Sequence, residues 1–243
     1  MNVLAIGNSY SEDATRYLHQ LARTCNRTIH ISNLYIGGCC LAKHYRNMCS
    51  EKAVYTHMFN GFRTGLKVSL KEALLTQEWD VITVQQHSFK STQYETFQPY
   101  LNELLSYVRK FAPKAKIAVH QTWGYKDGTE SLQHYESGSA MFKDSQANYE
   151  KVFYEIGADI LIPSGETMEG IKARGIRNCY RDSIHASKGI GRYALGLIWL
   201  KALTGICPYK VGDIDLDEEV SQEELEVAKD VVANIHLKSN IKS

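Results

Sequence analysis

Short apolar runs that alternate with segments of helical periodicity constrain the fold of this chain more than any other feature. Five runs have the length of a buried strand: 3–7, 28–36, 80–85, 115–120 and 158–163. Helical spacing of apolar residues marks the segments 11–25, 69–77, 99–111, 149–156, 187–203 and 221–236. Strands that are apolar throughout are buried on both faces, which is typical of parallel sheets covered by helices. The alternation predicts an α/β fold, a three-layer α/β/α sandwich around a mostly parallel five-stranded sheet.

The chain has the length of one large domain. Its 243 residues contain no internal repeat, no low-complexity segment and no linker rich in Pro, Gly or Ser. The least regular stretch, 123–146, is rich in Gly, Ser, Tyr and charge and is predicted to be a surface excursion. We therefore expect a single domain over residues 1–243.

Charge and apolar length argue against several classes of partner. Lys and Arg number 28 against 27 acidic residues, without a basic block, so neither nucleic acid nor an anionic membrane is an expected partner. The longest apolar stretch, 194–203, contains Lys201 and is too short to span a bilayer. Residues 3–7 favour a strand over a signal peptide, which predicts a cytoplasmic protein as the sequence stands, or a secreted one if an upstream leader was removed. The six cysteines have no metal-type spacing, so we expect neither a metal nor a cofactor.

The first apolar run leads into a small polar turn with a serine at the start of the next helix. Gly7, Asn8 and Ser9 follow one another there. Ligands of open parallel sheets bind beyond the carboxyl ends of strands, and free N–H groups at a helix N-terminus stabilise negative charge. Ser9 is therefore a candidate nucleophile. The alternative is that Ser9 only caps the helix, which is the commoner role of an isolated serine at such a junction.

A carboxylate and an imidazole lie three residues apart near the other end of the chain. Asp182 and His185 precede the apolar segment 187–203. In a loop, a carboxylate at this spacing can accept the Nδ1–H of the imidazole, which leaves Nε2 free to take a proton from a serine. Taken together, the two blocks predict a catalytic triad of Ser9, His185 and Asp182.

With these blocks the chain resembles the SGNH, or GDSL-type, hydrolase superfamily over residues 3–205. Gly7 to Ser11 stands at the nucleophile block of that superfamily, Ile36 to Cys39 at its oxyanion-hole glycine block, and Asp182 to His185 at its closing Asp-x-x-His block. More closely, the segments 7–13, 38–44, 84–88 and 191–193 resemble a branch common in gut bacteria and described as a domain of unknown function. The resemblance implies the flavodoxin-like SGNH fold, a serine hydrolase of carboxylic esters, and an oxyanion hole that includes the N–H groups of Ser9 and Gly38.

One block departs from the superfamily pattern. Its third block carries an asparagine that donates to the oxyanion, whereas this chain has Gln85, Gln86 and His87 in that place. A glutamine amide offers the same donors on a longer arm, so we expect Gln86, or otherwise Gln85, to be the third donor. Only one of them can face the site, because adjacent strand residues point to opposite faces. His87 is a further candidate that needs a fixed tautomer.

Two aromatic residues are candidates for substrate binding. Trp123 follows the run 115–120 at the edge where ligands collect, and Tyr180 precedes the Asp182 block. Trp123 can stack on a sugar or an acyl group, although an aromatic residue at this point packs in the core equally often.

These features predict an enzyme, a serine esterase or deacetylase that hydrolyses a small ester. An acetylated carbohydrate is the expected substrate by analogy alone. The alternatives are a lipid esterase or thioesterase of the same superfamily, and a catalytically silent carbohydrate-binding module. Nucleotide binding is disfavoured because the first turn lacks the glycine patterns that cradle phosphates. The sequence leaves the acyl group, the alcohol and the oligomeric state open.

Overall fold

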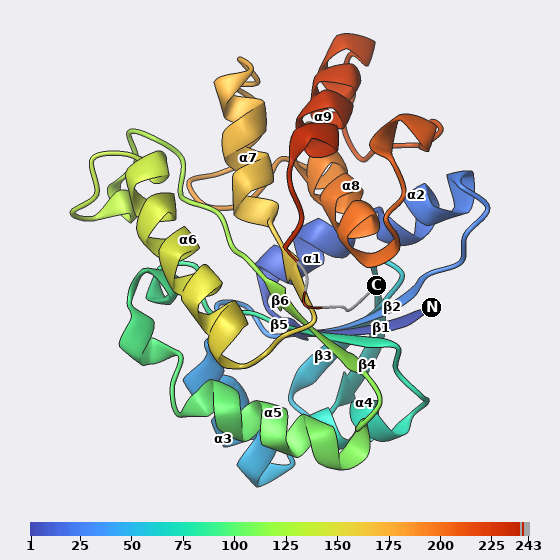
Figure 1. Cartoon of the computed structure of the whole chain (residues 1–243), viewed down its shortest axis with the longest axis vertical. Coiled ribbons are helices and arrows are strands. Elements are labelled where there is room, and N and C mark those ends of the chain that lie inside the picture. The colour runs from blue at the N-terminus through green and yellow to red at the C-terminus, as the bar shows by residue number, and fades with distance from the viewer. Residues whose placement is uncertain (239, 241–243) are drawn as a thin grey trace.

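A single sheet of seven strands forms the centre of the computed structural model, which describes residues 1–238 and 240 (Figure 1). Its strands lie in the order β4-β3-β2-β1-β5-β6-β7. Their bounds are β1 (Asn2–Gly7), β2 (His30–Tyr35), β3 (Tyr55–Phe59), β4 (Phe62–Val68), β5 (Val81–Val84), β6 (Lys116–His120) and β7 (Ile160–Ile162). The adjacent strands β2, β1, β5, β6 and β7 pair in parallel with one another. The remaining pairs, β2 with β3 and β3 with β4, are antiparallel. Residues 239 and 241–243 of the expected domain 1–243 lie outside the described residues.

Helices cover both faces of the sheet. Figure 1 shows α3, α4 and α5 on one side and α1, α2, α7, α8 and α9 on the other. The helices are α1 (Ser9–Thr15), α2 (Leu18–Thr24), α3 (Leu41–Ser50), α4 (Leu70–Leu75), α5 (Tyr100–Phe111), α6 (Gly138–Glu155), α7 (Ser164–Ala173), α8 (Ile190–Thr204) and α9 (Gln222–Asn234). Short 3₁₀ turns occupy Lys90–Thr92, Tyr94–Thr96, Glu130–Leu132 and Pro208–Lys210. None of the helices in the described part of the chain is long and apolar enough to span a membrane.

Strand β1 explains why the apolar runs predicted the layers correctly. Val3 and Ala5 pack into one buried cluster, with α1 and α8, whereas Leu4 and Ile6 pack into another, with α4 and α5. Alternate side chains of a strand point to opposite faces, so a continuous apolar run supplies both cores at once. The predicted three-layer α/β/α sandwich is confirmed.

The predicted number of strands is wrong, because five were expected and the sheet has seven. The two additional strands, β3 and β4, form a hairpin along the edge of the sheet. Asn60 and Gly61 join them with φ values of 49° and 86°. A two-residue hairpin turn of this kind requires positive φ at both positions, which Asn-Gly adopts most readily. The Asn-Gly pair was therefore the signal in the sequence, but β4 is largely exposed and has no apolar run.

Several predicted helices have different bounds. The helix expected over 11–25 is divided into α1 and α2, and its first turn is capped by Asn8, whose side chain accepts the N–H of Tyr10. The helix expected over 149–156 begins much earlier, at Gly138, because Ser137 caps it. Residues 138–146 of the expected surface excursion are therefore helical, and Met141, Phe142 and Ser145 among them are buried. Helices α3 and α7 were not predicted.

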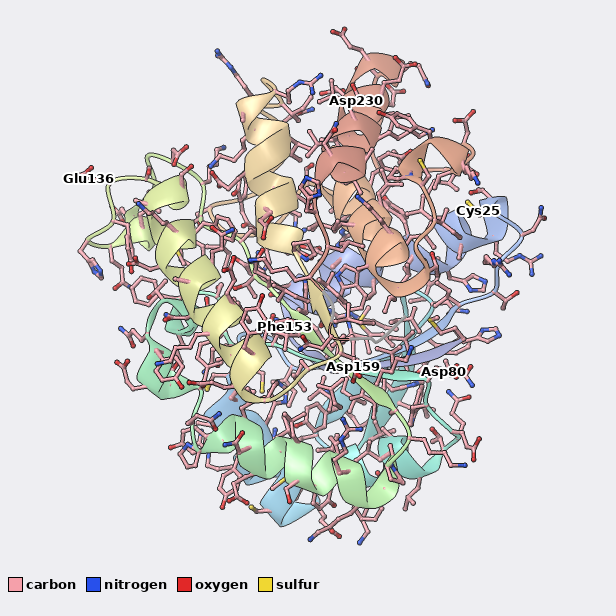
Figure 2. All side chains as sticks on the ribbon, in the orientation of Figure 1. Cys25, Asp80, Glu136, Phe153, Asp159 and Asp230 are labelled. Carbon is pink, nitrogen blue, oxygen red and sulfur yellow. The ribbon has the colours of Figure 1, made fainter. Side chains whose placement is uncertain are left out.

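The amino ends and the carboxyl ends of the strands carry different polar groups. Asp80 precedes β5 and accepts the N–H of Asn2 at 2.6 Å, and Asp159 precedes β7 and accepts the N–H of Ile117 at 2.7 Å (Figure 2). These carboxylates complete the hydrogen bonds of neighbouring strands at their amino ends. The predicted site residues lie at the other side, beyond the carboxyl ends of the strands.

Candidate active site

Three of the predicted blocks meet at the carboxyl ends of three adjacent strands. Ser9 follows β1, Gly38 follows β2, and His87 follows β5. The chain winds from β1 to β2 in one direction and later returns to β5 on the other side of β1, so the strand order reverses there. Crevices at such reversals are the usual binding sites of open α/β sheets.

Ser9 is the first residue of α1, and its hydroxyl is not used to cap the helix. Asn8 takes that role: its Oδ1 accepts the Tyr10 N–H at 2.9 Å and the Gln85 amide at 2.8 Å. The Asn8 amide also donates to the carbonyl of Cys39 at 2.9 Å, and the side chain is buried. Asn8 therefore ties the three blocks together, and the Ser9 hydroxyl remains available for His185.

Ser9, His185 and Asp182 form a continuous hydrogen-bonded chain. The Nε2 of His185 lies 2.8 Å from the Oγ of Ser9, and its Nδ1 lies 2.8 Å from the Oδ2 of Asp182. An ionised carboxylate only accepts hydrogen bonds, so Nδ1 carries the proton and Nε2 of the neutral ring accepts from the serine. The two ends of the sequence, 176 residues apart, thus meet in the arrangement that a serine nucleophile requires.

The loop around Asp182 holds its carboxylate in the charged state. Oδ1 accepts the N–H groups of Ile184 at 2.9 Å and of His185 at 2.7 Å. Burial acts to raise the pKa of Asp182, but these two hydrogen bonds and the one from the imidazole outweigh it, so the pKa lies below its usual value. The carboxylate is therefore suited to orient the ring of His185 and to stabilise its positive form.

Two buried aromatic residues hold the same loop through hydrogen bonds to its backbone. The hydroxyl of Tyr10 and the Nε1 of Trp123 both donate to the carbonyl of Ile184, each at 3.0 Å. The two rings stack with their centroids 3.9 Å apart. Trp123 is only 1% exposed, so the expected role as a substrate platform is wrong, and its position supports the residue next to His185.

Tyr180 is also not part of the Ser9 pocket. The residue is 8% exposed, its hydroxyl donates to the carbonyl of Gly124 at 2.8 Å, and it lines a separate cavity of about 260 Å³. The backbone of Tyr180 pairs with Ala186 and closes the loop that carries Asp182 and His185. Like Trp123, Tyr180 supports the loop that carries His185, and the expectation that it contacts substrate does not fit the structure.

A buried ion cluster connects this loop to α1. Asp13 is fully buried and lies 2.8 Å from a guanidinium nitrogen of Arg181 and 2.9 Å from one of Arg192. Arg181 also donates to the carbonyl of Ala186, while its backbone N–H donates to the carbonyl of His185 at 3.1 Å. The helix that begins with Ser9 and the loop that carries His185 are thereby fastened to each other.

The triad opens into a small cavity of about 190 Å³. Its lining consists of Asn8, Ser9, Tyr10, Tyr35, Gly37, Gly38, His87, Ser88, Ile184 and His185. Gly38 has a φ of 60°, a left-handed conformation that glycine adopts without strain. Among the described residues, no protein acceptor receives the backbone N–H of Ser9 or of Gly38. Two free donors beside the hydroxyl of a candidate nucleophile are the groups that an oxyanion hole would need.

The predicted glutamine donors are engaged elsewhere. The amide nitrogen of Gln86 donates to the carbonyl and the hydroxyl of Thr96, at 2.8 and 3.0 Å. That of Gln85 donates to Asn8. Neither glutamine lines the Ser9 cavity, so the expectation that Gln86, or otherwise Gln85, serves the oxyanion does not fit the structure. Both amides instead hold neighbouring turns in place.

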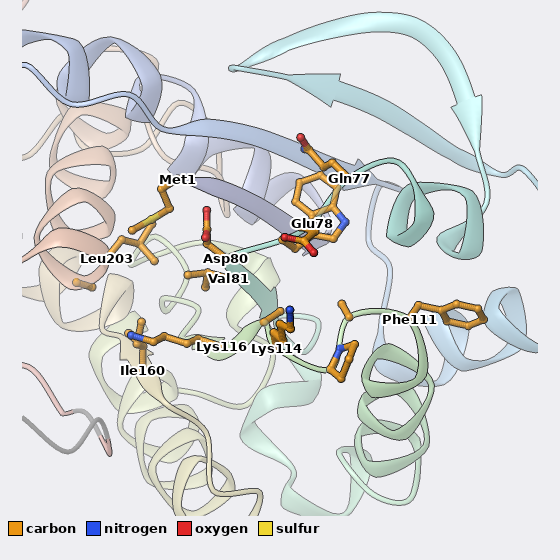
Figure 3. A pocket seen from close by; sticks show the side chains of 15 residues that line it. Met1, Gln77, Glu78, Asp80, Val81, Phe111, Lys114, Lys116, Ile160 and Leu203 are labelled. Carbon is orange, nitrogen blue, oxygen red and sulfur yellow. The ribbon is translucent and has the colours of Figure 1, made fainter.

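Other conspicuous groups in the described residues lack the elements of a second site. His120 is sealed between Gln85 and Ser164, and burial lowers its pKa to about 3, so it is a neutral core residue. A larger cavity of about 630 Å³ lies at the opposite, amino edge of the sheet, where Asp80 and Lys116 line it (Figure 3). That lining contains no Ser, Cys or His. No group of three or more His, Cys, Asp or Glu in the described part of the chain is arranged to hold a metal ion.

Sequence reasoning missed three contributors to the site. Asn8, Arg181 and Tyr10 each hold the turn or loop of a candidate catalytic residue in place, and none of them was assigned this role. The signal for Asn8 was its position as a helix-capping residue directly before the candidate nucleophile. For Arg181 and Tyr10 the sequence offers no such signal, because their partners lie 168 and 174 residues away.

Comparison with known proteins places this geometry in a family and a fold. A family model described as Domain of unknown function (DUF4886) matches residues 2–234. The crystal structure of a DUF4886 family protein from Bacteroides uniformis superposes with a TM-score of 0.89 at 29% identity, covering 96% of this chain and 93% of that one. No curated protein matches the chain in sequence.

More distant structures share the fold. A candidate SGNH hydrolase from Slackia heliotrinireducens has a TM-score of 0.58 at 21% identity, over 84% of this chain and 98% of that one. Phospholipase A1 from Streptomyces albidoflavus has a TM-score of 0.51 at 11% identity, over 84% of this chain and 98% of that one. At these identities the likeness concerns the architecture, and the chemistry has to be argued from the site itself.

Proposed function

We propose that this chain, which belongs to the DUF4886 family, is a serine esterase that removes a small acyl group from an ester. The observation that carries the proposal is the hydrogen-bonded chain from Ser9 through His185 to Asp182, next to two unpaired backbone N–H groups. A nucleophile, a base, a group that orients the base and an oxyanion site are the four elements of acyl transfer. The likeness in fold to SGNH hydrolases and to a phospholipase agrees with this reaction class.

The reaction proceeds in two displacements. Ser9 Oγ attacks the carbonyl carbon while its proton moves to Nε2 of His185, and the carbonyl oxygen becomes an oxyanion held by the N–H groups of Ser9 and Gly38. The tetrahedral intermediate then expels the alcohol, which takes the proton from His185 and leaves an acyl group on Ser9. Water, deprotonated by His185, hydrolyses this acyl-enzyme by the reverse sequence of steps. Asp182 stabilises the imidazolium in both halves.

The small size of the cavity favours an acetyl group. Pockets for drug-sized ligands are typically 300–1,000 Å³, whereas the Ser9 cavity is about 190 Å³. A long acyl chain finds no apolar channel in its lining, in which Ile184 is the only aliphatic side chain. The polar and aromatic groups of Tyr35 and Ser88 suit the hydroxyl-rich alcohol of an acetylated carbohydrate. We therefore place a lipid esterase or a thioesterase second.

Acyl length tests the substrate class. We expect kcat/KM for 4-nitrophenyl esters to fall by at least roughly tenfold from acetate to butyrate, because each methylene that does not fit a pocket costs about 1–3 kcal/mol. Acetylated glucose and xylose should be deacetylated, as measured by release of acetate. A rate that rises from acetate to octanoate would overturn the acetyl assignment and favour the lipid esterase.

Covalent labelling separates an enzyme from a binding module with the same fold. A fluorophosphonate reacts with an activated serine hydroxyl and not with an ordinary one. We expect mass spectrometry to find the label on Ser9 of the native protein and not on the heat-unfolded protein. A folded protein that binds acetylated sugars but takes no label would be a carbohydrate-binding module instead.

Activity should fall on acidification, because a proton on Nε2 of His185 abolishes the acceptor for the Ser9 proton. The lowered pKa of Asp182 keeps its carboxylate charged to a lower pH than that of an ordinary aspartate, so the carboxylate continues to orient the ring as the solution becomes acidic. We expect kcat/KM to decrease as the pH is lowered from neutrality. A kcat/KM that stays constant on acidification would contradict the assignment of His185 as the base.

A further inference from the structure

The oxyanion site has two backbone donors, and a third turn borders it. The N–H groups of Ser9 and Gly38 come from the turns after β1 and β2. The turn after β5 borders the same cavity, through His87 and Ser88. A tetrahedral oxyanion is stabilised best by donors that are already aimed at it from several sides. The side chains of this third turn therefore border the oxyanion site from the remaining side.

His87 lies against the glycine that provides the second donor. Its ring carbon Cδ2 is 4.0 Å from the position that a Cβ on Gly38 would occupy. Nε2 is bonded to Cδ2, so the Nε2 edge of the ring lies on the Gly38 side of the cavity. The backbone of His87 is held at both ends: its N–H donates to the Oε1 of Gln86 at 2.9 Å, and its carbonyl accepts the N–H of Ser91 at 2.8 Å. These two hydrogen bonds hold the turn that carries the ring.

The tautomer of His87 is determined by its own turn. The backbone N–H of Phe89 donates to Nδ1 of His87 at 3.2 Å. Because Nδ1 accepts, the proton of the neutral ring is on Nε2. Burial, with a smaller contribution from the charge of Lys90, lowers the pKa of His87 and so favours this neutral form. Among the described residues, Nε2 has no protein partner.

We propose that His87 is the third donor of the oxyanion hole and binds the tetrahedral intermediate through its Nε2–H. The proposal rests on the proposed esterase function. His87 transfers no proton in this role: the Ser9 proton goes to His185, and the negative charge on the former carbonyl oxygen is shared among the N–H groups of Ser9, Gly38 and His87. The two imidazoles at the site thus have opposite roles, one as a base through a free Nε2 and the other as a donor through a protonated Nε2.

Substitutions at His87 distinguish a donor from a residue that only fills space. His87→Phe keeps a ring but removes the donor, and we expect it to lower kcat for 4-nitrophenyl acetate by about 10²- to 10³-fold with KM within about threefold of wild type. His87→Asn restores a short N–H donor and should recover at least roughly tenfold of that loss. Melting temperatures identify any variant that has lost its fold.

A measurement on the wild-type protein makes the test independent of how the variants fold. In ¹⁵N-resolved spectra, the His87 ring signals can be assigned by their absence from His87→Phe, and we expect the neutral Nε2–H form at pH 7. Phosphonylation of Ser9 by a fluorophosphonate places a P–O oxygen at the oxyanion position. The Nε2 proton of His87 should then move downfield, because it enters a stronger hydrogen bond.

The outcomes separate this inference from the function on which it rests. A wild-type protein that neither labels at Ser9 nor cleaves any ester ends both. A wild-type protein that labels and cleaves, combined with a folded His87→Phe variant within threefold of wild-type kcat, ends the inference and leaves the esterase intact. A proton found on Nδ1 of His87, or an Nε2 proton unmoved by the Ser9 adduct, overturns the inference as well.

Discussion

Replacing Ser9 by alanine will lower kcat/KM for 4-nitrophenyl acetate by about 10⁴-fold or more while the protein remains folded. Loss of the nucleophile leaves only binding and the oxyanion donors to assist a water molecule, and triads lose most of their rate enhancement when one member is removed. The Ser9 hydroxyl bonds only to His185 in the described structure, and Asn8 caps the helix. The melting temperature should therefore stay within about 2 °C of wild type.

A nearby serine provides the matched control. Ser183 lies in the same loop as His185 but does not line the Ser9 cavity. Its hydroxyl accepts a hydrogen bond from the hydroxyl of Ser131 at 2.9 Å. Ser183→Ala should keep kcat/KM within about threefold of wild type and should still take the fluorophosphonate label. Turnover that survives in Ser9→Ala at more than one tenth of the wild-type rate would show that another group carries the chemistry.

Replacing Asp13 by asparagine will lower both stability and turnover, although Asp13 does not line the cavity. The change leaves the guanidinium groups of Arg181 and Arg192 without their shared buried carboxylate, and breaking a buried ion pair in this way costs about 3 kcal/mol. For a chain of this size we expect the melting temperature to fall by roughly 10 °C. Thermal unfolding followed by circular dichroism is the measurement.

The same substitution should also displace the base. Arg181 holds the carbonyl groups of His185 and Ala186, so loosening it frees the loop that carries His185. We expect kcat to fall more than KM rises. Glu51→Gln is the control, because Glu51 pairs with Lys71 on the surface and such pairs contribute less than about 1 kcal/mol. If Asp13→Asn unfolds at the wild-type temperature, or retains the wild-type kcat, the ion cluster does not position the loop.

The layers of the fold could be predicted from the sequence because the buried strands are apolar throughout. A run such as 3–7 supplies side chains to both faces of the sheet, so all of its residues have to be apolar and the run can be recognised from a short stretch of sequence. Strand β4 has no such requirement, since it lies at the edge with one side in solvent, and its sequence is mixed. The hairpin was missed for that reason, although the Asn-Gly pair at 60–61 carried a local signal.

The reacting groups and their supports differ in how much the sequence reveals. Ser9 and the Asp182–His185 pair stand out because their chemistry depends on short spacings next to a strand or a helix. Gln86 was predicted as an oxyanion donor and Trp123 as a substrate contact because both follow the carboxyl end of a strand. The structure turns both side chains to other partners, Thr96 and the carbonyl of Ile184.

By itself, the sequence determined that five buried strands form a mostly parallel sheet, that a serine follows the first of them at the start of a helix, and that an imidazole with its carboxylate lies near the other end of the chain. Parallel strands bring their carboxyl ends to one edge, so those residues are directed to the same region. Only the tertiary structure decided which polar groups keep a free donor beside Ser9. Hydrogen bonds depend on positions within a few tenths of an ångström, and the partners that occupy the glutamine amides and leave Nε2 of His87 free come from segments that the local pattern does not relate.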